Sequence, residues 1–287
     1  MPAPGNGPIT SAQIRYGMRS GYNAWLDYDR VSDTGLVVVC RDEDGNTDDG
    51  CIGEDALVVG PHRHRTTLTC SDDRPPCALD RLNPRHGATL GPGPDEVTAV
   101  AGRGTVQVVG FDGRLRRTID LTATGIDGED GVRLDWSPDG RRLAVATTSS
   151  VGTVIWLVDD AGGEPEPAYT AKKGFTVWDG PWWSPDGQSV VVDIGRSVGP
   201  TAHIDLLVLH LAPDGEAGAA PRPRLFHFER HFDWPANGNL AWAPDGTRIA
   251  VRTRDHITEI SAEDGSVIAQ HPHVGWLIWA PRTQERP

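Results

Sequence analysis

A five-residue motif that recurs along the chain constrains its fold more than any other feature of the sequence. It reads Trp-Ser-Pro-Asp-Gly at residues 136–140 and 183–187 and Trp-Ala-Pro-Asp-Gly at 242–246, and Trp-Ala-Pro begins again at residue 279. The copies are 47, 59 and 37 residues apart. An interval of roughly 40–50 residues fits one repeated unit of four short strands.

Each copy of the motif predicts a tight turn between two strands. Pro presets φ at the first corner, the Asp side chain hydrogen-bonds its own backbone, and Gly takes the position with φ > 0. Apolar or alternating segments precede the turns (VRLDW, GPWW, NLAW) and follow them (RRLAVATT, QSVVVDI, TRIAVRT), which predicts β-hairpins. A third strand is expected after each hairpin (TVIWLVDD, HIDLLVLHL, HITEISAED), and a weaker fourth strand in two of the repeats (PAYTA, RLFHFER).

Two degenerate units precede these copies, at residues 86–130 and 22–85, where VTAVAG, TVQVVGFDG, LVVVC and ALVVG read as strands. A last strand, HVGWLIWA, would complete a further sheet together with N-terminal residues such as ITSAQIRYG, and so close a ring of sheets. One sheet cannot bury both of its faces alone, so several must pack radially. We therefore expect an all-β chain: a single β-propeller of four-stranded antiparallel blades over residues 21–287, with six blades favoured over five. Residues 1–20 would be a flexible leader or a ring-closing strand.

The repeated Trp-Ser-Pro-Asp-Gly followed by an apolar strand resembles the TolB-like, or PD40 (WD40-like), propeller repeat family. The resemblance covers residues 86–281 well and residues 22–85 loosely. It implies a protein of the periplasm or envelope that binds other proteins, or a domain that gates an enzyme. It predicts the fold more strongly than the function, because one fold serves many functions.

Charge and cysteine content bound the partners and the compartment. The formal net charge of −13 disfavours nucleic acid as a partner, and no apolar run has the length of a membrane span. The cysteines form two close pairs, Cys40 with Cys51 and Cys70 with Cys77. Two local disulfides would each contribute roughly 2–4 kcal/mol and favour an oxidising compartment. We expect a monomer that is secreted or envelope-associated, with no signal peptide in this chain.

An acidic loop between the first two cysteines is the main candidate metal site. Asp42, Asp44, Asn46 and Asp48 place oxygen ligands at alternating positions, as calcium prefers. The loop lacks the Gly and the Glu that an EF-hand needs at its sixth and twelfth positions. The alternative is a solvated acidic loop held by a disulfide.

Paired histidines are a weaker candidate. His62 and His64, and likewise His271 and His273, alternate on expected strands. If ring closure brought the pairs together, four imidazoles would suit a transition metal. The alternative is scattered surface histidines.

A nucleophile motif also occurs in the sequence. Residues 195–199 match G-x-S-x-G, but that motif requires a helix after the serine, and here Pro200 and another strand follow. We interpret the segment as a hairpin within one blade. No catalytic residue is assigned.

The chain has ten tryptophans, which separate into two groups. Those of the repeat are expected to pack between blades: Trp136, Trp183, Trp242 and Trp279. Off the repeat, aromatic and acidic residues could hold a sugar or a peptide: Trp178, Asp179, Trp182, Asp233, Trp234 and Trp276.

Two functional hypotheses follow. The first is a non-catalytic binding or interaction module for a protein, peptide or glycan. The second is a propeller-mouth enzyme such as a lyase, lactonase or hydrolase, with or without a metal. Bound metal and activity lost on chelation would separate the second hypothesis from the first.

Overall fold

The computed structural model of this chain is built of β-strands. It describes residues 24–29, 34–41, 53–59, 65–68, 88–90, 97–102, 104–110, 115–122, 131–159, 165–198, 201–211, 221–230, 240–252 and 256–272. Twenty strands, β1 to β20, lie within these ranges. Contacts divide the chain into two compact units, one of residues 1–151 and 156–166 and the other of residues 152–155 and 167–287.

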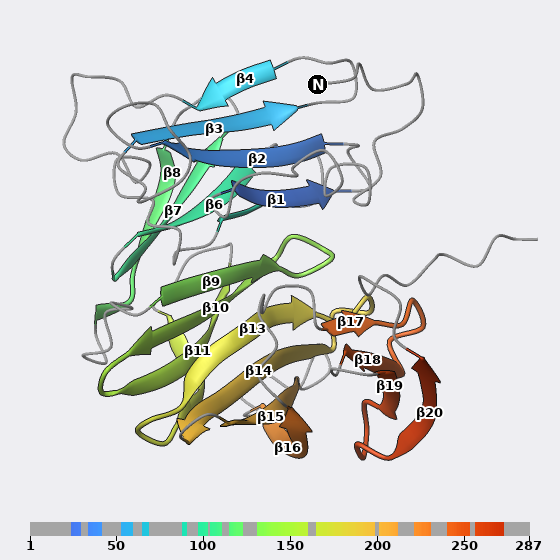
Figure 1. The fold of residues 1–287 in the computed structure, drawn as a ribbon. Helices are drawn as coiled ribbons and strands as arrows, with labels where there is room; N and C mark the ends of the chain where they lie inside the picture. The colour runs from blue at the N-terminus through green and yellow to red at the C-terminus, as the bar shows by residue number, and fades with distance from the viewer. Residues whose placement is uncertain are drawn as a thin grey trace, which may run out of the picture. The chain divides into compact units, whose positions relative to one another are not determined.

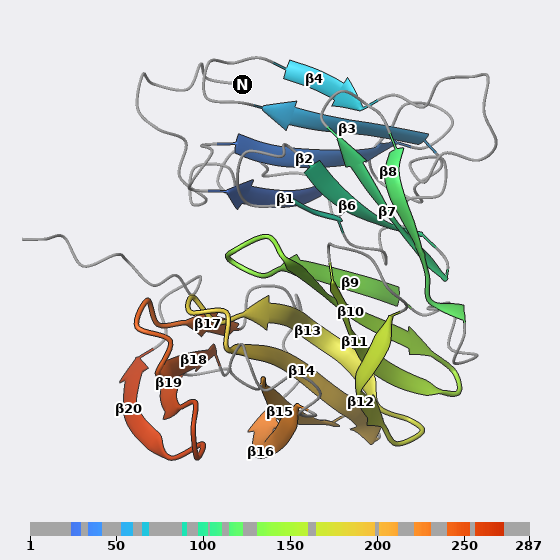
Figure 2. The ribbon, with the colours of Figure 1, turned by 180° about the vertical axis from the view of Figure 1, so that it is seen from behind.

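The strands form five sheets of four strands, each antiparallel and ordered as in the chain (Figures 1 and 2). The first sheet comprises β1 Ala24–Asp29, β2 Thr34–Arg41, β3 Gly53–Val59 and β4 Arg65–Leu68. The second comprises β5 Ala88–Leu90, β6 Val97–Gly102, β7 Thr105–Gly110 and β8 Leu115–Asp120. The third comprises β9 Gly131–Trp136, β10 Arg142–Ser149, β11 Gly152–Asp159 and β12 Glu166–Ala171.

The last two sheets lie in the second unit. The fourth sheet comprises β13 Thr176–Trp183, β14 Ser189–Val198, β15 Thr201–His210 and β16 Arg222–Arg230. The fifth comprises β17 Leu240–Trp242, β18 Arg248–Arg252, β19 His256–Ser261 and β20 Val267–Pro272. Within each unit the first strands of successive sheets contact one another: β1 with β5, β5 with β9, and β13 with β17.

The repeated motif forms the turn that the sequence predicts. The glycine N–H donates to the carbonyl oxygen three residues earlier at 2.9 Å, in the pairs Gly140–Ser137, Gly187–Ser184 and Gly246–Ala243. The φ angles of these glycines are 72°, 69° and 70°. Each Asp Oδ1 accepts the backbone N–H two residues later, at 3.1 Å for Arg141 to Asp139 and 3.0 Å for Gln188 to Asp186 and Thr247 to Asp245. The three copies of the motif therefore form the same hydrogen-bonded turn.

The hydroxyl that donates to the motif aspartate comes from a different residue in the third copy. In the first two copies the motif serine donates to the aspartate, at 2.6 Å for Ser137–Asp139 and 2.5 Å for Ser184–Asp186. Ala243 replaces that serine in the third copy, and the Thr247 hydroxyl donates to Asp245 at 2.8 Å instead. The backbone and hydroxyl hydrogen bonds from Thr247 lower the pKa of Asp245, because they stabilise the ionised carboxylate.

The repeat tryptophans are buried, as expected for residues that pack between sheets. Trp136, Trp183 and Trp242 are 6%, 6% and 9% exposed. Trp242 belongs to a core cluster between the fourth and fifth sheets, formed by Val191, Leu206, Val208, Leu240, Trp242, Ile249, Val251, Ile260 and Ala262. The Trp242 indole N–H also donates to the Trp182 carbonyl oxygen at 3.0 Å, which joins the first strands of the two sheets.

Five of the expected four-stranded units are confirmed, and five of their strands, β1, β4, β5, β8 and β20, were not among the predicted segments. Strand β20 was not anticipated as the fourth strand of its sheet. Residues 195–198 of the G-x-S-x-G segment lie on β14, and Ser197 is in register with Ala202 of β15. Strand is followed by strand, as the interpretation of the segment as a hairpin predicts. The segments proposed for ring closure, ITSAQIRYG and HVGWLIWA, lie outside the described residues.

Candidate functional site

Only part of the predicted site falls within the described residues. Trp178, Asp179 and Trp182 lie on β13, and His271 lies on β20. Cys40 lies on β2. The other predicted residues lie outside the described ranges: Asp42, Asp44, Asn46, Asp48, Cys51, His62, His64, Cys70, Cys77, Asp233, Trp234, His273, Trp276 and Trp279.

Strand β13 places a buried pair of carboxylates on neighbouring strands. Asp179 is in register with Asp193 of β14, and the pairing is irregular on both sides of Asp179. The two side chains are 2% and 0% exposed. Asp179 Oδ1 accepts the backbone N–H of Gly180 at 2.9 Å. Asp179 thus lies in the interior, and Asp193 is a neighbour that sequence reasoning did not find.

Gly180 fixes the irregular backbone beside this pair. Its φ is +83°, and a Cβ there would lie 2.8 Å from the Val191 carbonyl oxygen and 3.2 Å from Val192 Cα. Any side chain would collide with backbone atoms of β14, so only glycine fits.

The two tryptophans of β13 differ in their surroundings. Trp182 packs against the core cluster between the fourth and fifth sheets, and Trp178 is partly buried. The Trp182 indole N–H is buried and has no hydrogen-bond partner among the described residues. Trp182 therefore serves at least as a packing residue between these sheets.

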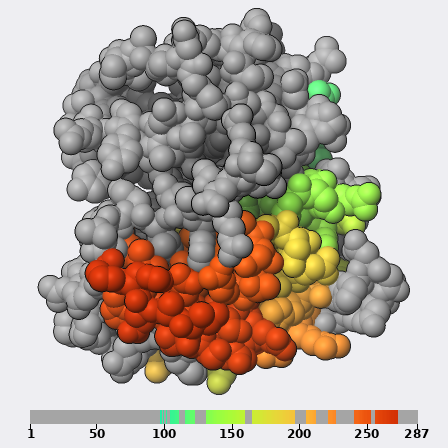
Figure 3. Space-filling view, turned by 90° about the vertical axis from the view of Figure 1, so that its right-hand side faces the viewer, coloured from blue at the N-terminus to red at the C-terminus, as the bar shows by residue number. Residues whose placement is uncertain are grey.

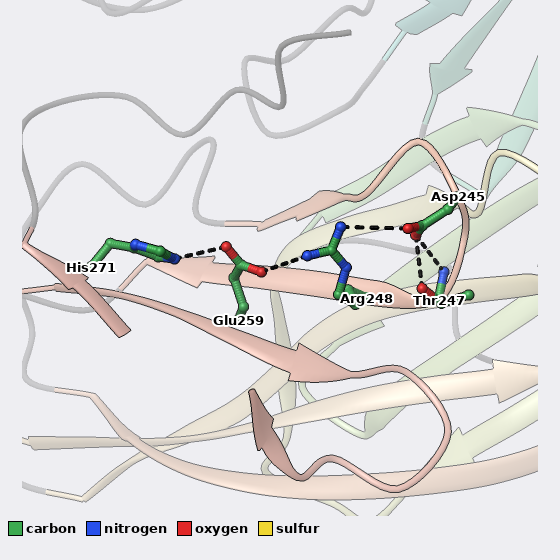
Figure 4. Close-up of polar contacts among 5 residues, drawn as sticks. All are labelled: Asp245, Thr247, Arg248, Glu259 and His271. Atoms are coloured by element: carbon green, nitrogen blue, oxygen red, sulfur yellow. Dashed lines mark hydrogen bonds and ion pairs between the residues drawn. The ribbon is translucent and has the colours of Figure 1, made fainter. Parts of the chain in front are cut away.

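The fifth sheet has one apolar face and one charged face. Alternate residues of β18 and β19, including Ile249, Val251 and Ile260, enter the core cluster. The opposite face carries a row of ionic contacts (Figure 4). Glu259 binds Arg248 at 2.9 Å with one carboxylate oxygen and His271 at 2.7 Å with the other.

This ionic row runs from the motif turn across β18 and β19 to the outer strand β20. Arg248 also contacts Asp245 of the turn at 3.4 Å. Side-chain exposure is lowest in the middle of the row, at 14% for Glu259 and 28% for Arg248, and highest at its ends, at 51% for Asp245 and 52% for His271. Figure 3 looks onto the fifth sheet, whose atoms form a continuous red and orange surface.

The outer strand of this sheet, β20, is exposed along nearly its whole length. Val267 and Ile268 are 58% and 51% exposed, and only Ala269 of this strand is partly covered. Val267 pairs with Ile260 and Ala269 with Glu259, so an irregularity leaves Ile268 without a register partner on β19. The strand thus presents two adjacent apolar side chains to solvent.

The turn that leads into β20 is acidic. Asp264 Oδ1 accepts the hydroxyl and the backbone N–H of Ser266, at 2.7 and 3.0 Å. Together with the Ser261 hydroxyl, these bonds lower the pKa of Asp264 to about 2. The neighbouring Glu263 is exposed, and its carbonyl oxygen accepts a hydrogen bond from the Arg224 guanidinium.

A half-buried histidine lies where the fourth sheet meets this turn. His210 Nδ1 lies 3.0 Å from the Ser189 hydroxyl, which is itself buried. Burial lowers the pKa of His210, and the Arg224 charge lowers it further, while Glu263 acts in the opposite direction. The imidazole is therefore neutral at neutral pH and accepts or donates a hydrogen bond within the sheet.

The described part of the chain lacks two kinds of feature. No group of three or more His, Cys, Asp or Glu side chains that could hold a metal ion is found there. No helix in the same ranges is long and apolar enough to cross a membrane.

Solved structures resemble this arrangement of sheets. The Dos1 propeller superposes with a TM-score of 0.54 at 8% identity, over 90% of this chain and 73% of that one. The fold is a β-propeller.

Two further structures are more distant. A chain of the nidogen/laminin complex has a TM-score of 0.48 at 13% identity, over 86% of this chain and 79% of that one. TolB from Acinetobacter baumannii has a TM-score of 0.45 at 12% identity, over 83% of this chain and 52% of that one. No protein-family model matches the sequence, and the comparison with curated proteins finds no match. At these identities the similarities concern the fold alone.

Proposed function

We propose that this β-propeller is a binding module for a protein or peptide and that the fifth blade, β17–β20, carries the contact surface. One observation carries the proposal: the adjacent apolar side chains of Val267 and Ile268 are both more than half exposed. Apolar residues that are exposed singly are common on soluble proteins, whereas contiguous exposed apolar surface marks interaction sites.

The distribution of exposed apolar side chains supports a contact through the outer strands. Four of the five large hydrophobic residues that are exposed among the described residues lie on fourth strands of blades: Leu115 on β8, Leu225 on β16, and Val267 and Ile268 on β20. Among the residues that the structure describes, only β20 has two of them side by side. The fifth blade is therefore the preferred contact.

Burial at β13 directs the proposal to protein and peptide ligands rather than glycans. A sugar-binding carboxylate must reach the ligand surface, and Asp179 is 2% exposed. Trp182 is engaged in packing between the last two blades.

We also propose that the protein works in the envelope or outside the cell. The support is the sequence pairing of Cys40 with Cys51 and Cys70 with Cys77, which suits disulfides and an oxidising compartment. Thiol titration of the denatured, unreduced protein would find no free thiol; four free thiols would contradict this placement.

Site-specific photo-crosslinking tests the binding function. A photoreactive residue is placed at position 268 and, as a matched control, at exposed position 115 on β8, in the native host. We expect a discrete adduct of one size from position 268 and none from position 115. Absence of any adduct from position 268, or equal adducts from both positions, would contradict the proposed function.

A further inference from the structure

The outer strands of the five blades differ in how they are protected against pairing with another strand. Charged residues and prolines on an edge strand discourage such pairing. Four of the outer strands carry them: β4 has an Arg at its start, β8 has two Arg, β12 has Glu followed by Pro, and β16 begins Arg-Pro-Arg. The fifth, β20, reads Val-Ile-Ala-Gln-His-Pro and has no Arg, Lys, Asp or Glu, and no Pro before its last residue.

The exposure of β20 shows that its unprotected edge is accessible to solvent. Its two leading apolar side chains are 58% and 51% exposed, whereas Ile249, Val251 and Ile260 of β18 and β19 enter the core. The irregular pairing at Ile268 gives some protection at the start of the strand, as bulges do on edges. From Ala269 to Pro272 the pairing with β19 is regular, so this part of the outer edge is straight enough to accept another strand.

The charge around β20 indicates which kind of partner strand would pair with it. Residues 256–272 contain Glu259, Glu263 and Asp264 and neither Lys nor Arg. Glu259 is neutralised by Arg248, but Glu263 and Asp264 are exposed at the turn that begins β20. Arg224 reaches the carbonyl oxygen of Glu263, and Asp264 remains ionised at any physiological pH because its pKa is about 2.

From this sequence and geometry, we propose that β20 binds an extended, basic peptide segment of a partner protein by strand addition. Backbone groups of β20 would supply the hydrogen bonds, Val267 and Ile268 would contact apolar side chains of the added strand, and Glu263 and Asp264 would attract its Lys or Arg residues. This inference rests on the proposed binding function and names its partner class.

A second copy of this chain is the competing occupant, and charge disfavours it. Each copy carries a formal net charge of −13 and the same acidic turn. Like charges brought together at an interface cost binding free energy, whereas a basic segment gains it.

The test uses the intact chain and a labelled nine-residue probe peptide, Lys-Val-Thr-Val-Lys-Val-Thr-Val-Lys, with both ends blocked. A matched peptide with Glu in place of every Lys is the charge control. Binding is measured by fluorescence anisotropy, and strand addition by hydrogen exchange at residues 267–272. We expect the basic peptide to bind, to slow exchange at β20, and to weaken with salt; the acidic peptide should bind at least about tenfold more weakly.

Three variants locate the contact. Ile268→Lys places a charge on the edge and should weaken the basic peptide about tenfold or more. Glu263→Lys reverses one charge of the turn and should weaken it several-fold. Leu115→Lys makes the same kind of change on the outer strand of the second blade, at a residue 55% exposed, and should leave binding unchanged. All three positions are exposed, so unaltered melting temperatures are the folding control.

Each other outcome overturns the inference. Equal affinity for both peptides, or equal weakening by Ile268→Lys and Leu115→Lys, would show that β20 and its charge are not the site. A dimer seen by light scattering and abolished by Ile268→Lys would assign the edge to a second copy. If neither peptide binds while photo-crosslinking from position 268 still captures a partner, the strand-addition inference fails and the binding function stands.

Discussion

The fourth and fifth blades share a core but differ in how they use their second face. In the fourth blade, both faces of β14 and β15 are apolar and buried: Val190 and Val191, adjacent and thus on opposite faces, are both 0% exposed, and so are Leu206 and Leu207. In the fifth blade, one face enters the shared core and the other carries the Arg248–Glu259–His271 row. The same four-stranded unit can therefore serve as interior packing or as a surface.

The largest loss of stability is expected at Gly180, where a side chain would collide with the backbone of β14 in the fourth blade. Gly180→Ala combines a positive φ with a Cβ 2.8 Å from a backbone oxygen. It should lower the free energy of unfolding by about 4 kcal/mol. Gly174→Ala is the control, since its φ is +90° but its Cβ would have open space; it should cost about 1–2 kcal/mol. Equal losses in urea denaturation would contradict this packing.

Truncation of apolar side chains should give the next largest difference in stability between the two blades. Leu207→Ala removes a side chain that is 0% exposed in the fourth blade and should cost about 3 kcal/mol. Val267→Ala removes one that is 58% exposed in the fifth and should change stability by no more than about 0.5 kcal/mol. A loss above about 2 kcal/mol for Val267→Ala would mean that β20 is covered in solution.

The ionic row should contribute less than the buried faces. Glu259→Gln removes the carboxylate charge that binds both Arg248 and His271. We expect a cost of about 1 kcal/mol, because its partners are partly exposed and surface ion pairs are weak. A double-mutant cycle with Arg248→Gln, at low and at high salt, measures the pair. A coupling energy above about 3 kcal/mol would contradict this prediction, because it would mean that the ionic row is covered and not partly exposed.

A pH dependence should mark the contact between the two blades. The pKa of His210 is lowered on folding by burial, so below its unfolded value of about 6.5 the unfolded chain binds more protons. Stability is complete above that pH and declines as the pH falls below it. His210→Gln should flatten the melting temperature between pH 7 and pH 5 relative to the unchanged chain. An identical slope in both proteins would contradict the shift.

The smallest expected effect concerns the hydroxyl that donates to Asp245 in the third turn. Thr247→Val removes the hydroxyl that donates to Asp245 at 2.8 Å and should cost about 0.5–1 kcal/mol. Ala243→Ser should restore most of this loss, because Ser137 and Ser184 occupy the equivalent buried position in the other two turns. No restoration in the double variant would mean that the third turn differs from the others.

Local chemistry made much of this fold predictable. The Pro-Asp-Gly turns, the positive φ of their glycines and the burial of Trp136, Trp183 and Trp242 follow from residues close together in sequence. Strand β20 escaped prediction because Val-Ile-Ala-Gln-His-Pro neither alternates nor forms an apolar run, as expected for an edge exposed on both faces. Its place is set by pairing with β19.

The candidate site was less predictable because register and irregular pairing decide it. Asp193 lies opposite Asp179 only because β13 is irregular on both sides of Asp179. Glu259 and His271 are 12 residues apart and meet across two strands. Such contacts require the register of a sheet, which a one-residue slip would alter completely.

Hydrogen exchange of the intact chain, resolved by short peptides, tests whether β20 is an open strand at the edge of its sheet. If β20 is an open outer strand, its amides should exchange at least about a hundredfold faster than those of β14 and β15, whose side chains are buried on both faces. Comparable protection of residues 267–272 and residues 190–194 would show that β20 is covered, and would contradict its role as a contact strand.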